Sequence, residues 1–279
     1  MPGTTDDREQ GRVGSQDVAT VFDVPSEDFA HLRESVWEPV AAATIAQSRP
    51  IPGAKVLDAC CGDGATALPA ARQVGTTGRV DAVDLSAGLV GVLRARAVML
   101  PQLVATAADV TTWDRPGGYD MVQCALGVCD FPDVAAGTDH LVGLARPGGR
   151  VTLTVWRQGA LAPIAETLAA AVAEQRDGAP APAVGRPTGP VAGLDTVESF
   201  TAWLGERGLR DVRVTEARRT LELTADLAWH LVIGTTLREL LAGLSVTKVV
   251  EARRGYLRGL AAQEATNVDL SVLVGTGTR

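Results

Sequence analysis

The sequence contains few aromatic side chains and few lysines. Aromatic residues make up only 4% of the chain, so its core must be built mainly from Ala, Val and Leu. The 26 basic residues include only two lysines, Lys55 and Lys248, and the formal net charge is -7. Binding to a nucleic-acid backbone depends on Lys and Arg that neutralise phosphates. The acidic balance therefore disfavours a nucleic-acid partner.

The sequence also has no segment that is typical of export or membrane insertion. Residues 1–16 are polar and acidic, without the apolar stretch of a secretory signal. Nowhere do about 18 uninterrupted apolar residues occur, as a membrane-spanning helix would require. We therefore expect a cytoplasmic protein that does not insert into membranes.

Cysteine and histidine are scarce, with four and three residues respectively. The cysteines lie in or beside apolar runs, without CxxC spacing or clustered histidines, which argues against a zinc site or a disulfide framework. We expect buried, reduced thiols and no metal site. The four cysteines are Cys60, Cys61, Cys124 and Cys129.

The apolar pattern predicts strands that alternate with helices. After an amphipathic helix at residues 28–47, short apolar runs occur with helical patterns between most of them. Strands that are buried on both faces and separated by helices indicate a parallel sheet in an α/β fold. The predicted strands are 55–58, 79–84, 103–107, 119–124 and 150–156, followed by 210–217 and 267–274.

These patterns divide the 279 residues into one α/β core with additions. Residues 178–193 are rich in Pro and Gly and predict a loop, which we expect to act as a lid. Residues 226–263 predict helices with an interruption near Gly243. The expected segments are a disordered tail (1–16), N-terminal cap helices (17–50), a ligand-binding core (51–157), a helical insertion with the Pro/Gly-rich loop (158–209), and two strands with inserted helices covering the active site (210–279).

The most informative segment is residues 56–64, an apolar strand that ends in Asp58 and leads into Gly62 and Gly64. Glycines at this position let the backbone approach a ligand closely, and the helix that follows offers free N–H groups. The next strand ends in Asp84, which is well placed to accept hydrogen bonds from two ribose hydroxyls. Asp109 follows the third strand. Three acids at successive strand ends suit a ligand that carries hydroxyl and amino groups.

In these segments the sequence resembles class I S-adenosylmethionine-dependent methyltransferases, in the branch similar to the ubiquinone/menaquinone C-methyltransferases. The resemblance covers residues 56–156 and implies a Rossmann-like, seven-stranded methyltransferase sheet with helices on both faces and a helical region covering the substrate. Five motifs occur in the family's order. They are residues 58–64, Asp84-Leu85-Ser86, Asp109-Val110, Phe131-Pro132-Asp133, and Leu144 with Arg146-Pro147-Gly148-Gly149.

The resemblance implies S-adenosylmethionine as cofactor and a small-molecule acceptor such as a quinone, another aromatic or a secondary metabolite. Asp58 and Gly62 would lie near the methionine part, and Asp84 would bind the ribose. Asp109 would accept from the adenine amino group, while the backbone of Cys124 and Ala125 would lie near the methionine amine. The remaining expected cofactor residues are Cys60, Gly64, Leu85 and Val110.

The chain departs from the family pattern at two places. Cys60 stands where the family's first glycine is usual, which puts cofactor affinity to the test. Cys129 and Asp130 replace two histidines that often precede Phe-Pro-Asp, which removes any substrate role inherited from them. Candidate substrate contacts are Cys129 and Trp156. His31 and His230 are candidate bases, because they lie in regions that cover the active site in this family.

Two other functions stay open from the sequence. The pattern Gly62-x-Gly64-x-x-Ala67 partly matches the nicotinamide-dinucleotide fingerprint, so an oxidoreductase is one alternative. Asp58, Asp109 and the Pro-Gly-Gly turn favour the methyltransferase. The other alternative is a protein that keeps the S-adenosylmethionine pocket for a non-methylating role such as cyclisation or sensing. The acceptor, the methylated atom and the choice between monomer and homodimer stay undetermined.

Overall fold

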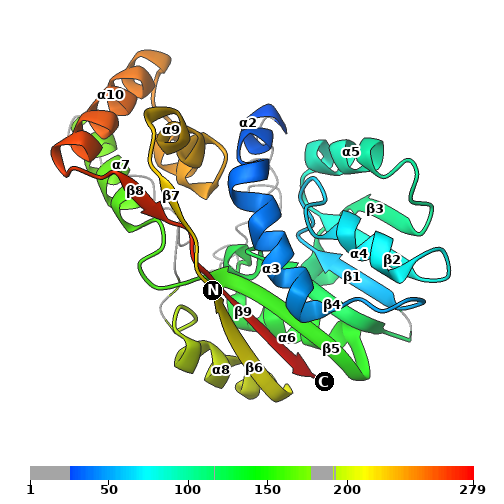
Figure 1. Cartoon of the computed structure of the whole chain (residues 1–279). Coiled ribbons are helices and arrows are strands. Elements are labelled where there is room, and N and C mark those ends of the chain that lie inside the picture. Colours follow the sequence, from blue (N-terminus) through cyan, green and yellow to red (C-terminus); the bar gives the residue numbers. More distant parts are fainter. Residues whose placement is uncertain (1–25, 116, 177–190, 192) are drawn as a thin grey trace, which may run out of the picture.

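The computed structural model describes residues 26–115, 117–176, 191 and 193–279. The expected N-terminal tail and nearly all of the expected Pro/Gly-rich loop lie outside these residues. A mixed seven-stranded sheet forms the centre of the molecule, in the order β3-β2-β1-β4-β5-β9-β6 (Figure 1). Its strands are β1 (Lys55–Ala59), β2 (Arg79–Asp84), β3 (Leu103–Ala107), β4 (Tyr119–Ala125), β5 (Ala145–Trp156), β6 (Arg210–Ala217) and β9 (Val272–Thr278).

The first five of these strands are parallel, and β9 runs antiparallel between β5 and β6. Strand β1 lies between β2 and β4, and all its residues after Lys55 are buried. A central strand of this kind has no polar face, which explains the nearly continuous apolar run in the sequence. The carboxyl ends of β1 to β5 meet at one edge of the sheet, where the acids predicted to bind the ligand are located.

Helices cover both faces of the sheet, which confirms the predicted α/β fold class. Helices α3 (Glu38–Ser48), α4 (Ala67–Val74) and α5 (Ala87–Arg96) pack on one face, and α6 (Val134–Leu144) and α8 (Val197–Glu206) pack on the other. Ser86 and Asp133 cap α5 and α6, because their side chains accept hydrogen bonds from backbone N–H groups of the first helical turn. Two short 3₁₀ turns follow β3 and β4, η2 (Val110–Thr112) and η3 (Val128–Asp130).

A second hydrophobic cluster lies beyond the carboxyl edge of the sheet and is formed largely by helices. We call the elements that form this cluster the cap. Figure 1 shows α7, α9 and α10 grouped on one side of the molecule, with α2 beside them. Buried residues such as Leu32, Leu168, Leu231 and Tyr256 form its core. The cap comprises α2 (Ser26–His31), the π-helical turn η1 (Arg33–Trp37), α7 (Ala162–Glu174), β7 (Thr220–Glu222), α9 (Ala225–Ile233), η4 (Thr236–Leu241), α10 (Val246–Ala262) and β8 (Asn267–Asp269).

The structure corrects two details of the predicted elements. The predicted final strand at 267–274 is two strands: β8 pairs with β7 in a separate two-stranded sheet, and only β9 joins the main sheet. The helical region 226–263 is interrupted at Gly234 as well as near Gly243. Gly234 packs closely on another cap segment, since a Cβ there would lie 2.8 Å from Leu32. That close approach of two cap segments depends on tertiary packing, which local sequence patterns do not report.

None of the helices in the described ranges combines the length and apolar character that a membrane span needs.

Candidate active site

A cavity of about 360 Å³ lies at the carboxyl edge of the sheet, between the strand ends and the cap. The loops after β1, β2, β3 and β4 contribute one side, and Phe29, Trp37 and residues 234–236 contribute the other. The described residues lining it include four aspartates and no arginine, lysine or histidine. A cavity of this size and charge suits a small molecule that carries a positive charge.

The loop after β1, residues 60–64, forms the floor of the cavity, and we call it the glycine loop. Gly62 has a φ of +52°, and a Cβ there would meet the ring of Phe29 at 3.2 Å. Gly64 has a φ of +96° and does not line the cavity, because it packs against α5, where a Cβ would lie 2.3 Å from Leu93. Gly62 therefore permits the close approach of the Phe29 ring, whereas Gly64 permits the helix to pack.

Two of the strand-end acids face the cavity with their orientation held by backbone and side-chain donors. The carboxylate of Asp84 accepts hydrogen bonds from the N–H of Gly62 at 2.8 Å and of Ser86 at 2.9 Å. Burial raises the pKa of Asp84, while these two backbone donors oppose the change. Asp109 accepts from the N–H of Thr111 at 2.8 Å. Each carboxylate has further lone pairs for a ligand's hydroxyl or amino group.

Asp58 lies beneath the cavity floor and is not among the lining residues. It is fully buried on β1, and its carboxylate accepts from the hydroxyl of Thr66 at 2.8 Å and from the side-chain amide of Gln123 at 3.0 Å. Burial raises the pKa of Asp58 to about 7, and the nearby charge of Asp84 also raises it. Asp58 thus lies under the floor and contacts Thr66, which does line the cavity, and its position near the methionine part of a cofactor stays a prediction.

Cys60 occupies the left-handed region with a φ of +55°, where glycine is favoured. Gly127 accommodates its side chain, because a Cβ at Gly127 would lie 2.3 Å from the Cys60 Cβ and 3.1 Å from the Cys124 Sγ. A hydrogen bond to Cys124 and then burial raise the pKa of the Cys60 thiol well above its usual value. The glycine that makes this space is thus on the facing loop, at Gly127, and not at the usual first position of the motif. The cysteines are free thiols, and among the described residues no cluster of His, Cys, Asp or Glu is arranged to hold a metal.

Aromatic side chains gather at this cavity although they are rare in the chain. The sequence has five Trp, two Tyr and four Phe, and four of these rings line the cavity: Phe29, Trp37, Phe131 and Trp156. We call these four rings the aromatic wall. Phe29 and Trp37 stack with ring centroids 4.8 Å apart and an interplanar angle of 14°. The aromatic wall offers flat apolar surfaces to a ligand.

The structure brings most of the predicted site residues to the cavity, but not all. Those that line it are Cys60, Gly62, Asp84, Leu85, Asp109, Val110, Ala125 and Trp156. Asp58, Gly64, Cys124 and Cys129 are behind the lining. Cys129 is buried in the core beneath the 3₁₀ turn η3, and its neighbour Asp130 faces the cavity instead. The turn therefore decides that Asp130, and not Cys129, faces the cavity.

The two candidate bases lie outside the lining. His31 on α2 and His230 on α9 stack on each other, with ring centroids 4.3 Å apart and an interplanar angle of 7°. His31 is exposed, and the pair joins two helices of the cap. This position corrects the expectation that either ring touches a reacting group.

Sequence reasoning missed Phe29, Trp37, Asp130 and the residues 234–236 as lining residues. For Phe29 and Trp37 the helical spacing was visible, because with Arg33 between them they recur every four residues. That spacing marks one face of a helix without saying which loop it meets. Residues 234–236 carry no recognisable motif.

The strand order, the antiparallel strand β9 between β5 and β6, and the acids that follow successive strands together define a Rossmann-like methyltransferase domain. Residues 56–149 match the family model described as a methyltransferase domain. The chain therefore carries a methyltransferase domain, with the cap built from segments on both sides of it.

Known methyltransferases are among the relatives of this chain. It is 29% identical to aklanonic acid methyltransferase DauC of Streptomyces sp. over 51% of this chain and 67% of the relative. It is 31% identical to nocamycin O-methyltransferase of Saccharothrix syringae over 49% of this chain and 48% of the relative. A third relative is the 2-phytyl-1,4-naphtoquinone methyltransferase of Nostoc sp., 28% identical over 49% of this chain and 60% of the relative. The chain thus matches about half to two thirds of the length of these relatives.

Solved structures share the fold over most of the chain. The YcgJ protein of Bacillus subtilis aligns over 86% of this chain and 97% of its own, with a TM-score of 0.57 and 15% identity. The cyclase SpnF aligns over 95% of this chain and 96% of its own, also with a TM-score of 0.57, at 13% identity. At these identities the likeness shows the fold alone.

Proposed function

We propose that this protein transfers a methyl group from S-adenosylmethionine to a flat aromatic small molecule. The observation that carries the proposal is that one cavity joins the strand-end acids of the sheet to the aromatic wall. Relatives that act on aklanonic acid, nocamycin and a naphthoquinone support a small aromatic or secondary-metabolite acceptor.

The described lining fits this cofactor in shape and charge. Asp84 presents carboxylate oxygens to the two hydroxyls of a ribose, and Asp109 lies beyond it, where it would accept from the adenine amino group. The carboxylates of Asp84 and Asp109 complement the charge of a cationic cofactor. When bound, S-adenosylmethionine supplies a methyl group on a positively charged sulfur that is a good leaving group.

The protein then has to align the acceptor with this methyl group and exclude water. Alignment of this kind contributes on the order of 7 to 11 kcal/mol to lowering a barrier. The flat surfaces of Trp37 and Trp156 would orient the acceptor, and the cap would keep water out.

For a hydroxyl acceptor we propose Asp130 as the group that takes the proton. The titratable residues of the described lining are cysteines and aspartates only. A hydrogen bond to Cys124 and then burial raise the pKa of the Cys60 thiol, and burial with nearby aspartates raises that of Cys61, which keeps both thiols protonated. Asp63 lies on the glycine loop beside the cofactor residues, and the carboxylates of Asp84 and Asp109 would bind the cofactor. Asp130 is on the turn after β4. In the sheet, β1 separates β4 from β2 and β3, the strands that lead to those two acids.

The first test is calorimetry with S-adenosylmethionine, S-adenosylhomocysteine and the nicotinamide dinucleotide. We expect isotherms with the first two ligands only. Heat with the nicotinamide dinucleotide alone would refute the methyltransferase and favour the oxidoreductase.

The second test follows transfer of a labelled methyl group to hydroxylated naphthoquinones and anthraquinones, with the matching carboxylic acids as controls. We expect transfer to at least one hydroxylated quinone, whether or not its carboxylic acid counterpart also reacts. Tight S-adenosylmethionine binding without transfer to any of them would instead favour the non-methylating role.

A further inference from the structure

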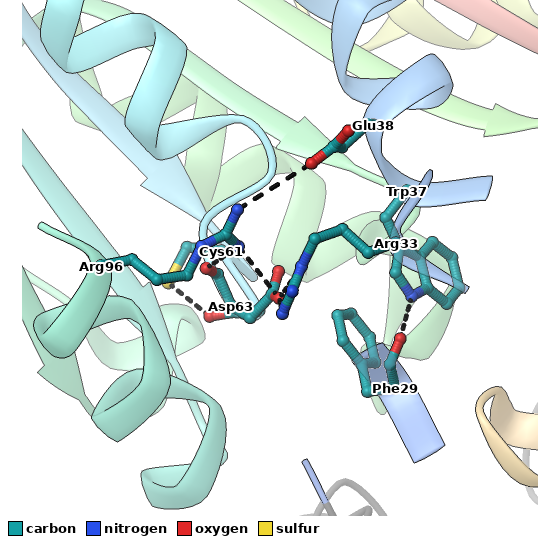
Figure 2. A network of polar contacts seen from close by, with 8 residues as sticks. Phe29, Arg33, Trp37, Glu38, Cys61, Asp63 and Arg96 are labelled. Carbon is teal, nitrogen blue, oxygen red and sulfur yellow. Dashed lines mark hydrogen bonds and ion pairs between the residues drawn. The ribbon is translucent and has the colours of Figure 1, made fainter. Parts of the chain in front are cut away.

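A network of ion pairs ties the glycine loop to the N-terminal part of the cap. Asp63 is only 2% exposed, and its Oδ2 accepts from the Nε of Arg33 at 2.8 Å and contacts the Arg33 Nη2. Arg96 of α5 approaches the same oxygen at 3.0 Å and donates to the Asp63 carbonyl at 2.9 Å. A second guanidinium nitrogen of Arg96 lies 4.0 Å from Glu38. Figure 2 shows Arg33 and Arg96 converging on Asp63, with Glu38 linked to Arg96, and we call these four side chains the clasp.

The geometry of η1 explains how one segment reaches both the clasp and the cavity. Leu32 accepts from the N–H of Trp37 at 3.1 Å, a bond across five residues that widens the helix into a π turn. The indole N–H of Trp37 donates to the Phe29 carbonyl at 3.1 Å (Figure 2), so the side chain satisfies a backbone group at the change of helical register. Phe29 and Trp37 stack on each other at the cavity, while Arg33, which lies between them in the sequence, reaches Asp63.

The clasp therefore connects two parts of the cavity. On one side Phe29 and Trp37 form part of the aromatic wall, and on the other Gly62 and Asp63 form the floor. The Phe29 ring lies against Gly62 and stacks on Trp37. A displacement of the glycine loop would therefore also displace these two rings. A nearly buried carboxylate between two guanidinium groups permits few alternative arrangements, because either partner left alone would be a poorly solvated charge.

We propose that Arg33 and Asp63 are positioning residues, whose ion pair couples cofactor binding on the glycine loop to the placement of Phe29 and Trp37. This proposal rests on the proposed function. A cofactor that orders the glycine loop also favours the position of residues 26–37 in which Arg33 contacts Asp63. By thermodynamic linkage, this position of residues 26–37 strengthens cofactor binding by the same factor. The aromatic wall is thus complete for an acceptor when the cofactor is present.

The test combines calorimetry with hydrogen-exchange mass spectrometry, with and without S-adenosylhomocysteine. In the wild type we expect the ligand to slow exchange at residues 26–37. Arg33→Gln should abolish this slowing and weaken S-adenosylhomocysteine binding by about five- to a hundredfold, the usual range of such couplings. Arg33→Lys should restore part of both effects, since it keeps the charge but not the two-pronged geometry of the guanidinium.

Two further variants separate coupling from a general loss of stability. Asp63→Asn removes the other partner and, where it folds, should behave as Arg33→Gln does. Arg146→Gln breaks an ion pair to Asp120 of 2.7 Å that lies outside the cavity lining, and it should match the wild type in both measurements. A merely structural ion pair would change exchange equally with and without the ligand.

Retained binding and retained ligand-dependent slowing in Arg33→Gln would overturn the coupling while leaving the proposed function intact. Absence of S-adenosylmethionine and S-adenosylhomocysteine binding in the wild type would instead refute the proposed function and the coupling with it.

Discussion

The buried carboxylate of Asp58 makes the stability of this protein depend on pH in a direction opposite to that of most aspartates. Burial raises its pKa to about 7 in the folded state from an ordinary value of 3.8. Between these two values the folded chain holds a proton that the unfolded chain has lost. The free energy of unfolding therefore falls as pH rises through this range. Fully ionised Asp58 costs about 4 kcal/mol relative to the protonated form, at 1.36 kcal/mol per unit.

Asp58→Asn tests this reasoning, because the amide is neutral at every pH. The hydrogen bonds from Thr66 and Gln123 set an offset between variant and wild type that does not depend on pH. From about pH 5 to pH 8 the difference in unfolding free energy should change by about 2.5 kcal/mol in favour of the variant. Urea unfolding followed by circular dichroism at several pH values measures it.

Asp120→Asn is the matched control. The backbone N–H of Lys55 and the guanidinium of Arg146 hold the pKa of Asp120 below its ordinary value, so it stays ionised over the whole range. Its stability difference from the wild type should not vary with pH there. Parallel profiles for wild type and Asp58→Asn would show that the two donors fully offset burial, and the argument for a raised pKa would fail.

Three other predictions concern the loops and the chemistry. Gly127→Ala should lower the free energy of unfolding by about 1 to 3 kcal/mol, because the added methyl group would overpack against Cys60. In a double-mutant cycle Cys60→Gly should recover most of this loss. Simple additivity of the two changes would contradict the proposed contact. Asp84→Ala should weaken S-adenosylhomocysteine binding by about ten- to a hundredfold, the effect of losing hydrogen bonds to a charged acceptor, and an unchanged calorimetric Kd would remove it from the ribose role. With a hydroxyl acceptor, Asp130→Asn should lower kcat roughly a hundred- to ten-thousandfold whereas His230→Gln should not, and the reverse result would return the base role to the histidine.

The sequence allowed the fold and one half of the candidate site to be predicted, because both depend on local patterns. A buried parallel strand is recognisable in the sequence as a short apolar run. The residue that follows such a run lies at the carboxyl edge of the sheet, whatever position the strand takes in the strand order. Asp84, Asp109 and Gly62 could therefore be assigned to one edge before the strand order was known. The other half of the cavity contains Phe29, Trp37 and residues 234–236, which come from segments far apart in the chain.

Tertiary structure decided which side chains face the cavity and which lie behind it. Asp84 is the last residue of β2 and reaches the cavity, whereas Asp58 comes one residue before the end of β1, with Gln123 directly opposite, and is sealed beneath the floor. The 3₁₀ turn η3 presents Asp130 and buries Cys129. His31 and His230 stack on each other because α2 packs on α9. Apolar periodicity sets which elements form, whereas long-range packing sets how their last residues are oriented, and the chemistry of the site depends on that orientation.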